Sequence, residues 1–169
     1  LSGSTTNAQE DNDATSGHPL ELPPEVHSKT LQPASLEDAK EALKEKEFSR
    51  AIEFCEVSLA RQSGDLTQVT ALYSSALRGQ AASFDGKDAN KAEILLRKAI
   101  EVDPQNFDAH FDLGKLYTKS KDQAKAIKSF QKAAGLNPRS AKTAFNLGFI
   151  YATTEDYANA EEQFHRAVE

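Results

Sequence analysis

The sequence lacks several features that would point to particular classes of protein. Its 169 residues contain no Met, no Trp and a single Cys. That residue, Cys55, cannot form an internal disulfide, and it lies among apolar positions, where a thiol packs as a small hydrophobic group. No stretch approaches the roughly 20 apolar residues that a membrane-spanning helix needs. The net charge of −6 argues against a nucleic-acid partner, because such a surface needs an excess of basic residues.

Patterns that carry catalysis or metal binding are also missing. The four histidines are scattered, and none stands at metal-ligand spacing from another His or Cys. No nucleophile elbow and no phosphate-binding glycine loop occurs. We interpret His110 as a partly buried, hydrogen-bonded packing residue. The sequence therefore predicts a protein that is not an enzyme, has no metal and no cofactor, and works by binding.

The first part of the chain, residues 1–31, differs in composition from the rest. It is rich in Ser, Thr, Asn, Asp, Gly and Pro, has no apolar periodicity, and its five carboxylates against Lys29 give it a net charge of −4. Such a segment buries too little apolar surface to offset its chain entropy, so we expect a disordered acidic leader or linker. Because the chain begins without Met, we expect a processed or shortened start, with a signal or membrane tether upstream as one explanation.

A repeat with a step of 34 residues occupies the C-terminal half of the sequence. The segments 107–117 (FDAHFDLGKLY) and 141–151 (AKTAFNLGFIY) align at this step. The residue pairs that keep it are Pro104/Pro138, Leu113/Leu147, Gly114/Gly148, Tyr117/Tyr151, Ala126/Ala160, Phe130/Phe164 and Ala133/Ala167. Apolar residues three or four positions apart predict two amphipathic helices in each unit. Gly114 and Gly148 keep this step although glycine is unfavourable inside a helix. We interpret both as positions where a neighbouring helix approaches the backbone closely.

Capping residues predict where these helices begin. Asn106 and Ser140 follow the Asp-Pro and Asn-Pro breaks, and their side chains can cap the helices that start there. Asp122 and either Glu155 or Asp156 can cap the second helices. Ser35 and Asp38 have the spacing of a capping box at the start of the folded region.

A 34-residue period that carries these residues resembles the tetratricopeptide repeat. The resemblance covers most of residues 35–169 and implies an all-α, right-handed α-solenoid of about four antiparallel helix pairs in a domain spanning residues 32–169. The units are expected at about 32–65, 66–106, 107–140 and 141–169. The second unit has one extra residue near 85–88 and lacks an aromatic residue near Ala82, for which Phe84 is a candidate substitute. The first unit is degenerate.

The resemblance also implies a function, because the first helices of such repeats line a concave groove that holds a segment of another protein. The groove positions are Asp108, Phe111, Asp112, Lys115, Thr118, Lys142, Phe145, Asn146, Phe149 and Thr153. We expect the three phenylalanines to be exposed binding anchors; the alternative is that they pack against second helices. The aspartates favour a partner segment with apolar anchors and a Lys or Arg. They disfavour the terminal carboxylate of a chaperone, and no Lys/Asn pair for it occurs in 73–83.

Two further interpretations follow from the end of the chain and from its lysines. The last helix leaves Tyr157, Ala160, Phe164 and Ala167 without a covering helix, so either more repeats follow or this face pairs with another copy in a homo-oligomer. Another alternative is that the chain is the interaction region of a larger multi-domain protein whose activity lies in a different domain. A run of lysines, interrupted by aspartates, is interpreted as a solvated helix face: Lys115, Lys119, Lys121, Lys125 and Lys128.

Overall fold

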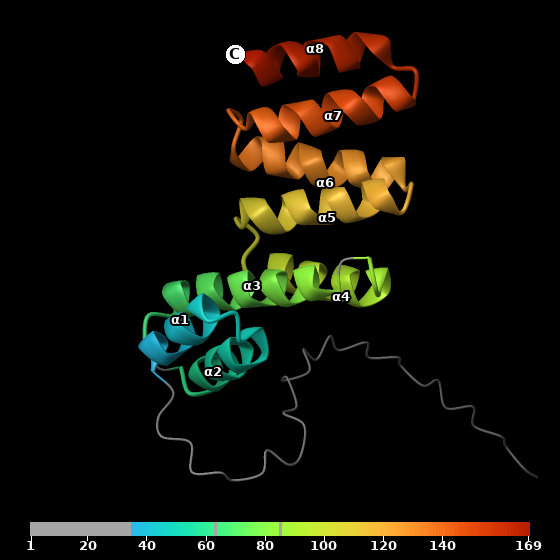
Figure 1. The fold of residues 1–169 in the computed structure, drawn as a ribbon. Coiled ribbons are helices and arrows are strands. Elements are labelled where there is room, and N and C mark those ends of the chain that lie inside the picture. Colours follow the sequence, from blue (N-terminus) through green and yellow to red (C-terminus); the bar gives the residue numbers. More distant parts are fainter. Residues whose placement is uncertain (1–34, 63, 85) are drawn as a thin grey trace, which may run out of the picture. The chain divides into compact units, whose positions relative to one another are not determined.

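The computed structural model describes residues 35–62, 64–84 and 86–169, which contain eight α-helices and no strand (Figure 1). The predicted disordered leader, residues 1–31, lies outside the described residues. All the described residues lie in one compact unit, Pro33–Glu169. The helices are α1 Leu36–Lys44, α2 Phe48–Ala60, α3 Leu66–Ser83, α4 Ala89–Val102, α5 Phe107–Lys119, α6 Gln123–Leu136, α7 Ala141–Thr153 and α8 Tyr157–Val168. The all-helical fold predicted from the sequence is confirmed.

The helices form four successive pairs, α1/α2, α3/α4, α5/α6 and α7/α8, and each pair packs against the next. From α5 to α8 every helix lies beside the one that precedes it in the chain (Figure 1). Helices α3, α5 and α7 begin at Leu66, Phe107 and Ala141, the residues at which the second, third and fourth expected units start. We call α1, α3, α5 and α7 the first helices and the others the second helices.

Side-chain caps begin seven of the described helices. The predicted capping box is present, because the Ser35 side chain accepts from the Asp38 backbone N–H and Asp38 accepts from the Ser35 backbone N–H. The other caps are Asp65, Asp88, Asn106, Asp122, Ser140 and Asp156. Each accepts hydrogen bonds from backbone donors that have no partner within the helix, so each fixes where its helix starts.

The turn inside each helix pair contains a residue with a left-handed backbone. In three pairs it is not glycine: Lys46, Lys121 and Glu155 have φ of 62°, 61° and 61°. Lys121 and Glu155 keep the 34-residue step of the repeat. In the second pair, whose loop is longer, the position is taken by Gly86 with φ of 75°. This backbone costs little for glycine and more for other residues, so the shorter turns carry some strain.

A phenylalanine ring lies against a helical glycine at three places. An added Cβ at Gly114 would come within 2.8 Å of the Phe130 ring, and one at Gly148 within 2.8 Å of the Phe164 ring. The predicted close approach at these glycines is therefore confirmed, although the group that approaches is a ring and not a small residue. At Gly79 the ring that an added Cβ would meet belongs to Phe48 of the preceding second helix.

Buried apolar residues form two clusters that cover successive pairs. One extends from α3 to α7 and includes Leu113, Phe130 and Leu147; the other extends from α1 to α5. Phe84, expected to replace a missing aromatic, packs against the first cluster. Cys55 is 1% exposed in the second cluster, and burial, with a smaller effect of Glu56, raises the pKa of its thiol to about 11. It is therefore a packing residue, as predicted.

Candidate protein-binding surface

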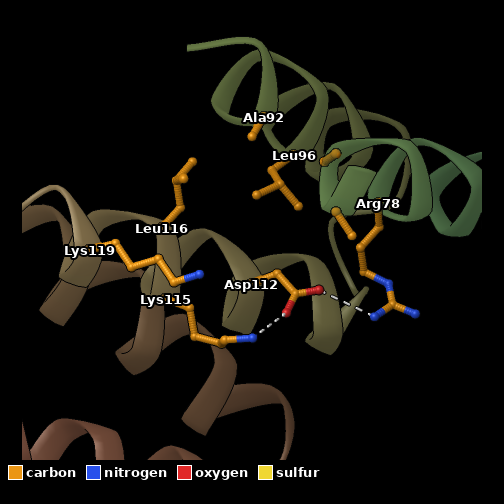
Figure 2. Close-up of a pocket in the computed structure, with 9 residues that line it drawn as sticks. Arg78, Ala92, Leu96, Asp112, Lys115, Leu116 and Lys119 are labelled. Atoms are coloured by element: carbon orange, nitrogen blue, oxygen red, sulfur yellow. Dashed lines mark hydrogen bonds and ion pairs between the residues drawn. The ribbon is translucent and has the colours of Figure 1, made fainter. Parts of the chain in front are cut away.

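Charged side chains connect the first helices α3, α5 and α7. Arg78 of α3 lies 3.3 Å from the Asp112 carboxylate and 3.9 Å from that of Asp108, both on α5. Lys142 of α7 lies 3.3 Å from Asp108. Lys115 also reaches Asp112, at 3.8 Å, and Figure 2 shows Asp112 between Arg78 and Lys115. We call the surface formed by these residues the first-helix face.

The carboxylates predicted to attract a basic partner residue thus already have cationic partners within the chain. Three cations, Arg78, Lys115 and Lys142, surround two carboxylates, so this row has one positive charge in excess. All five side chains are partly exposed, and exposed ion pairs of this kind exchange easily because they contribute little energy. A basic residue of a partner remains a prediction, and it would have to replace Arg78 or Lys142.

The prediction that Phe111 is an exposed anchor is wrong. Phe111 is 8% exposed and packs edge-on against Phe130 of α6, with ring centroids 5.4 Å apart. It also stacks with Phe107, and the Lys142 ammonium lies 4.5 Å from its ring centroid. The alternative interpretation, packing against a second helix, therefore holds at this position, because the ring lies against Phe130 of α6.

Phe145 and Phe149 of α7 are exposed, as expected. Their exposed fractions are 57% and 50%, although Phe145 also lies 5.8 Å from the Phe164 ring of α8. Phe145 is the repeat equivalent of the buried Phe111, and Phe149 that of Lys115. Asn146, between them, donates to the Lys142 carbonyl oxygen at 2.7 Å. Two large aromatic side chains one helical turn apart, both half in water, are suited to contact an apolar side chain of another molecule.

A small cavity of about 70 Å³ lies between α3, α4 and α5. Its walls are Arg78, Ala81, Ala82, Ala92, Leu96, Asp112, Lys115, Leu116 and Lys119 (Figure 2). Ala82 stands where the later units have Tyr117 and Tyr151, and Leu96 where they have phenylalanines, so the second unit fills less volume here. Within the described residues the buried Arg78 Nε has no hydrogen-bond partner.

Sequence reasoning missed Arg78. Aligning Gly79 with Gly114 places Arg78 at the position of Leu113, where the later units have a buried leucine. A charged residue at an apolar position of a repeat was the available signal. The extra residue in the second unit hid it, because counting back 34 residues from Leu113 reaches Gly79 instead.

The end of α7 and α8 carries an open apolar groove of about 570 Å³. It is lined by Ala152, Tyr157, Ala160, Glu161, Phe164 and His165. Tyr157 is 68% exposed, Phe164 36% and the neighbouring Val168 83%. Of the residues expected on this face, Ala160 is only 4% exposed, since it packs inside the helix pair and forms the floor of the groove, and Ala167 is partly buried. We call this surface the terminal face.

The histidines and carboxylates of the described chain form no group of three or more that could hold a metal ion. His110 is partly buried, and its Nε2 lies 3.1 Å from the Pro104 carbonyl oxygen, as the packing interpretation predicted. His165 is exposed and lies 3.8 Å from Glu161. No helix in the described ranges has the length and apolar character required to cross a bilayer.

Comparisons with known proteins identify the repeat. Residues 95–128 and residues 124–169 match two family models, each described as tetratricopeptide repeat. No curated protein matches the chain. Among solved structures, a crystal structure of MamA is similar, with 21% identity and a TM-score of 0.54, covering 79% of this chain and 74% of that one.

Two further solved structures have the same fold. A structure of MamA AMB-1 has 26% identity and a TM-score of 0.53, covering 79% of this chain and 71% of that one. YrrB, described as a TPR protein with an unusual peptide-binding site, has 18% identity and a TM-score of 0.50, covering 78% of this chain and 64% of that one. Residues 95–169 of this chain thus match the tetratricopeptide repeat, through two family models that overlap at residues 124–128.

Proposed function

We propose that this chain is a non-catalytic protein-interaction module that holds a segment of another protein on its first-helix face. The observation that carries the proposal is the exposure of Phe145 and Phe149 on α7, next to the ion-paired row of α3, α5 and α7. Aromatic side chains, phenylalanine included, are enriched at the centres of protein interfaces relative to the rest of the surface. Similarity to YrrB, whose structure has a peptide-binding site by its description, gives independent support.

The chemistry of the face suggests how a segment would bind. An apolar side chain of the segment would cover Phe145 and Phe149, removing both rings from water. Beside it, the segment would meet Asn146, Asp108 and Asp112, where a Lys or Arg would exchange for the Arg78 or Lys142 contacts. Because these pairs are exposed, the exchange costs little and would contribute more to specificity than to affinity.

The test uses peptides selected from a random phage-displayed library on the full chain. Phe149→Ala and Phe145→Ala should each weaken binding of the selected peptides by about tenfold, because each removes an aromatic contact. Asp112→Lys should weaken peptides that carry a basic residue. Binding is measured by titration calorimetry, and the thermal midpoint of each variant shows that it is folded.

Ile94→Ala is the matched control for these variants. Ile94 is 65% exposed on the second helix α4, so its truncation removes a similar apolar surface from a different face. It should leave peptide affinity unchanged. The proposal would be wrong if the selected peptides bound Phe145→Ala and Asp112→Lys as tightly as they bind the unaltered chain.

A second candidate function is self-assembly through the terminal face. It is supported by the open groove on α7 and α8 and by the exposed Tyr157, Phe164 and Val168. In the preceding pair, the equivalents of the lining residues Ala160 and Phe164 are the fully buried Ala126 and Phe130, which pack in one cluster with Leu147 and Ile150 of the next first helix. A second copy would supply a comparable cover for the terminal face.

Sedimentation velocity over a concentration series tests self-assembly. A stable dimer that Tyr157→Glu or Val168→Glu dissociates, while Ile94→Glu does not, would support it. Both residues of the terminal face are exposed, so a charge there should not disturb the fold. A chain that stays monomeric at every concentration would refute it.

A further inference from the structure

A second groove lies on the other side of α5 from the first-helix face. It has a volume of about 480 Å³ and runs between the second helices α4 and α6, with α5 below it. Leu113 and Tyr117 of α5 line it, and Leu113 is two positions from Lys115 of the first-helix face. Residues two apart in a helix point to nearly opposite sides. The two surfaces are therefore separate.

Four cationic side chains line this groove, which we call the basic groove: Arg97 of α4 and Lys125, Lys128 and Lys132 of α6. Glu101 is the only carboxylate among the lining residues that the structure describes. The floor is apolar and consists of Ile100, Leu113 and the Tyr117 ring. A chain whose net charge is −6 thus concentrates positive charge in one hollow of its surface.

Two of the four cations are used inside the chain and two are not. Arg97 contacts Glu93 at 2.9 Å and donates to the Tyr117 hydroxyl at 3.0 Å, and Lys125 contacts Asp122 at 2.9 Å. For Lys128 and Lys132 no ion pair occurs within the described ranges of the chain. They stand three and seven residues after Lys125 on one side of α6, where like charges repel. The stability of the helix does not explain this arrangement.

The repeat supplies an internal comparison. One step of 34 residues later, the equivalent positions of α6 and α8 have Gln131 for Arg97, Asn159 for Lys125, Glu162 for Lys128 and Arg166 for Lys132. The two charged residues among these four, Glu162 and Arg166, have opposite signs. Gln131 donates to Tyr151 at 3.1 Å, as Arg97 does to Tyr117. An uncharged residue therefore suffices to hold this tyrosine, and the fold itself does not require a basic groove.

We propose that the basic groove binds an acidic segment of another protein. Carboxylates of the segment would pair with Lys128 and Lys132, and an apolar side chain would lie on Ile100, Leu113 and Tyr117. Charge complementarity selects an acidic occupant, and the apolar floor selects a polypeptide over a nucleic acid. The acidic chain as a whole repels an extended polyanion, which interacts over a longer range than a short segment does.

The experiment measures binding of a fluorescein-labelled acidic peptide of mixed Glu and Leu to the full chain by fluorescence anisotropy. Its matched peptide has Gln in place of Glu. The acidic peptide should bind and the Gln peptide should not, and affinity should fall as salt rises, because exposed charges are screened. Lys128→Glu should weaken binding by about tenfold, since it reverses one charge at the rim of the groove.

Two controls separate the position of the charge from the net charge. Lys87→Glu makes the same change of charge in the loop before α4, where the side chain is exposed, and should leave affinity within about twofold of the unaltered chain. The double variant Lys128→Glu with Glu162→Lys keeps the net charge of the chain but moves the lysine to the equivalent position of α8. It should bind as weakly as Lys128→Glu. Glu already stands at the equivalent position of α8, so the helix tolerates it.

Several results would overturn the proposal. One is failure of the unaltered chain to bind the acidic peptide, and another is an equal loss with Lys87→Glu. Full recovery in the double variant would mean that net charge alone governs binding. Tighter binding of a labelled DNA duplex, or of phosphatidylserine vesicles, than of the acidic peptide would assign the groove to a different class of ligand. If weaker binding of Lys128→Glu came with a lower thermal midpoint, the substitution would have damaged the fold. Lys128→Gln removes the charge but keeps a good helix former, so it should keep the thermal midpoint of the unaltered chain and still bind the acidic peptide more weakly. Unchanged affinity of Lys128→Gln would then contradict the proposal.

Discussion

At the scale of single residues, the same amino acid has different roles in equivalent places. Phe130 and Phe164 both lie against a helical glycine, but Phe130 is fully buried and Phe164 is 36% exposed. Gly135, in contrast, has no atom within 4 Å of an added Cβ. The effect of a Gly to Ala substitution on stability should therefore differ among the three positions according to how tightly each is packed.

Gly114→Ala should lower the free energy of unfolding by about 1–2 kcal/mol, because a helix-propensity gain of about 1 kcal/mol is outweighed by the clash with the buried Phe130 ring. Gly148→Ala should change it by less than about 0.5 kcal/mol, since the exposed Phe164 ring can shift. Gly135→Ala should raise it by about 0.5 kcal/mol. Urea unfolding gives all three values. A stabilising Gly114→Ala would contradict the packing described at this position.

Sequence periodicity could identify the phenylalanines but not their exposure. Phe111 and Phe145 occupy the same repeat position, so the sequence predicts one environment for both, yet the first is 8% and the second 57% exposed. The difference depends on the Lys142 side chain of α7, which lies over the Phe111 ring, while within the described residues no side chain of a further first helix lies over Phe145 in the same way. Exposure is a property of the neighbours in space, which a local pattern does not contain.

At the scale of helices, side-chain caps were the most predictable feature, because a cap acts over three residues. The Ser35 capping box and the caps at Asn106, Asp122 and Ser140 were predicted and are confirmed, and of the two alternatives Glu155 and Asp156 the structure selects Asp156. The longer second unit was harder. Its cap, Asp88, follows an inserted residue, and the shift in register concealed that Arg78 replaces a leucine.

Three capping aspartates should make stability depend on acid. Backbone N–H groups of Gln68 and Lys91 lower the pKa of Asp65 and Asp88, and the Lys125 side chain lowers the pKa of Asp122. Folding therefore favours the ionised form. Its stabilisation is complete above about pH 4, the ordinary value for Asp, and is lost as pH falls below it through the lowered pKa values.

The triple variant Asp65→Asn, Asp88→Asn, Asp122→Asn isolates this effect. Asn caps helices nearly as well as Asp but does not titrate. Thermal midpoints measured at neutral pH and at about pH 3 should therefore differ less for the triple variant than for the unaltered chain. An equal acid-induced drop in both proteins would show that other carboxylates are responsible.

At the scale of the whole molecule, buried apolar contacts join the helix pairs, and the ion pairs of the first-helix face lie at the surface. Leu147 is 3% exposed in the cluster that extends from α3 to α7. Lys142 and Asp108, by contrast, have side chains that are 53% and 45% exposed. The two contacts should therefore differ strongly in energy.

Leu147→Ala should lower the free energy of unfolding by about 2–5 kcal/mol, because it leaves a cavity between successive pairs. Lys142→Met, which keeps an apolar stem near Phe107 and Phe111, should cost less than about 1 kcal/mol. Chemical denaturation measures both. If the lysine variant proved as costly as the leucine variant, electrostatic contacts would have a larger part in the fold than the structure indicates.

The sequence by itself determined the helices, their caps, the 34-residue step and the pairing of helices, because each depends on residues close together in the chain or on a strict repeat. Only the tertiary structure decided which aromatic side chains stay in water and which carboxylates already have a cation. It also decided that Arg97 and three lysines from another helix share one groove. These features depend on which helices lie side by side, and burial and charge are set by every neighbour within a few ångströms, whatever its distance along the chain.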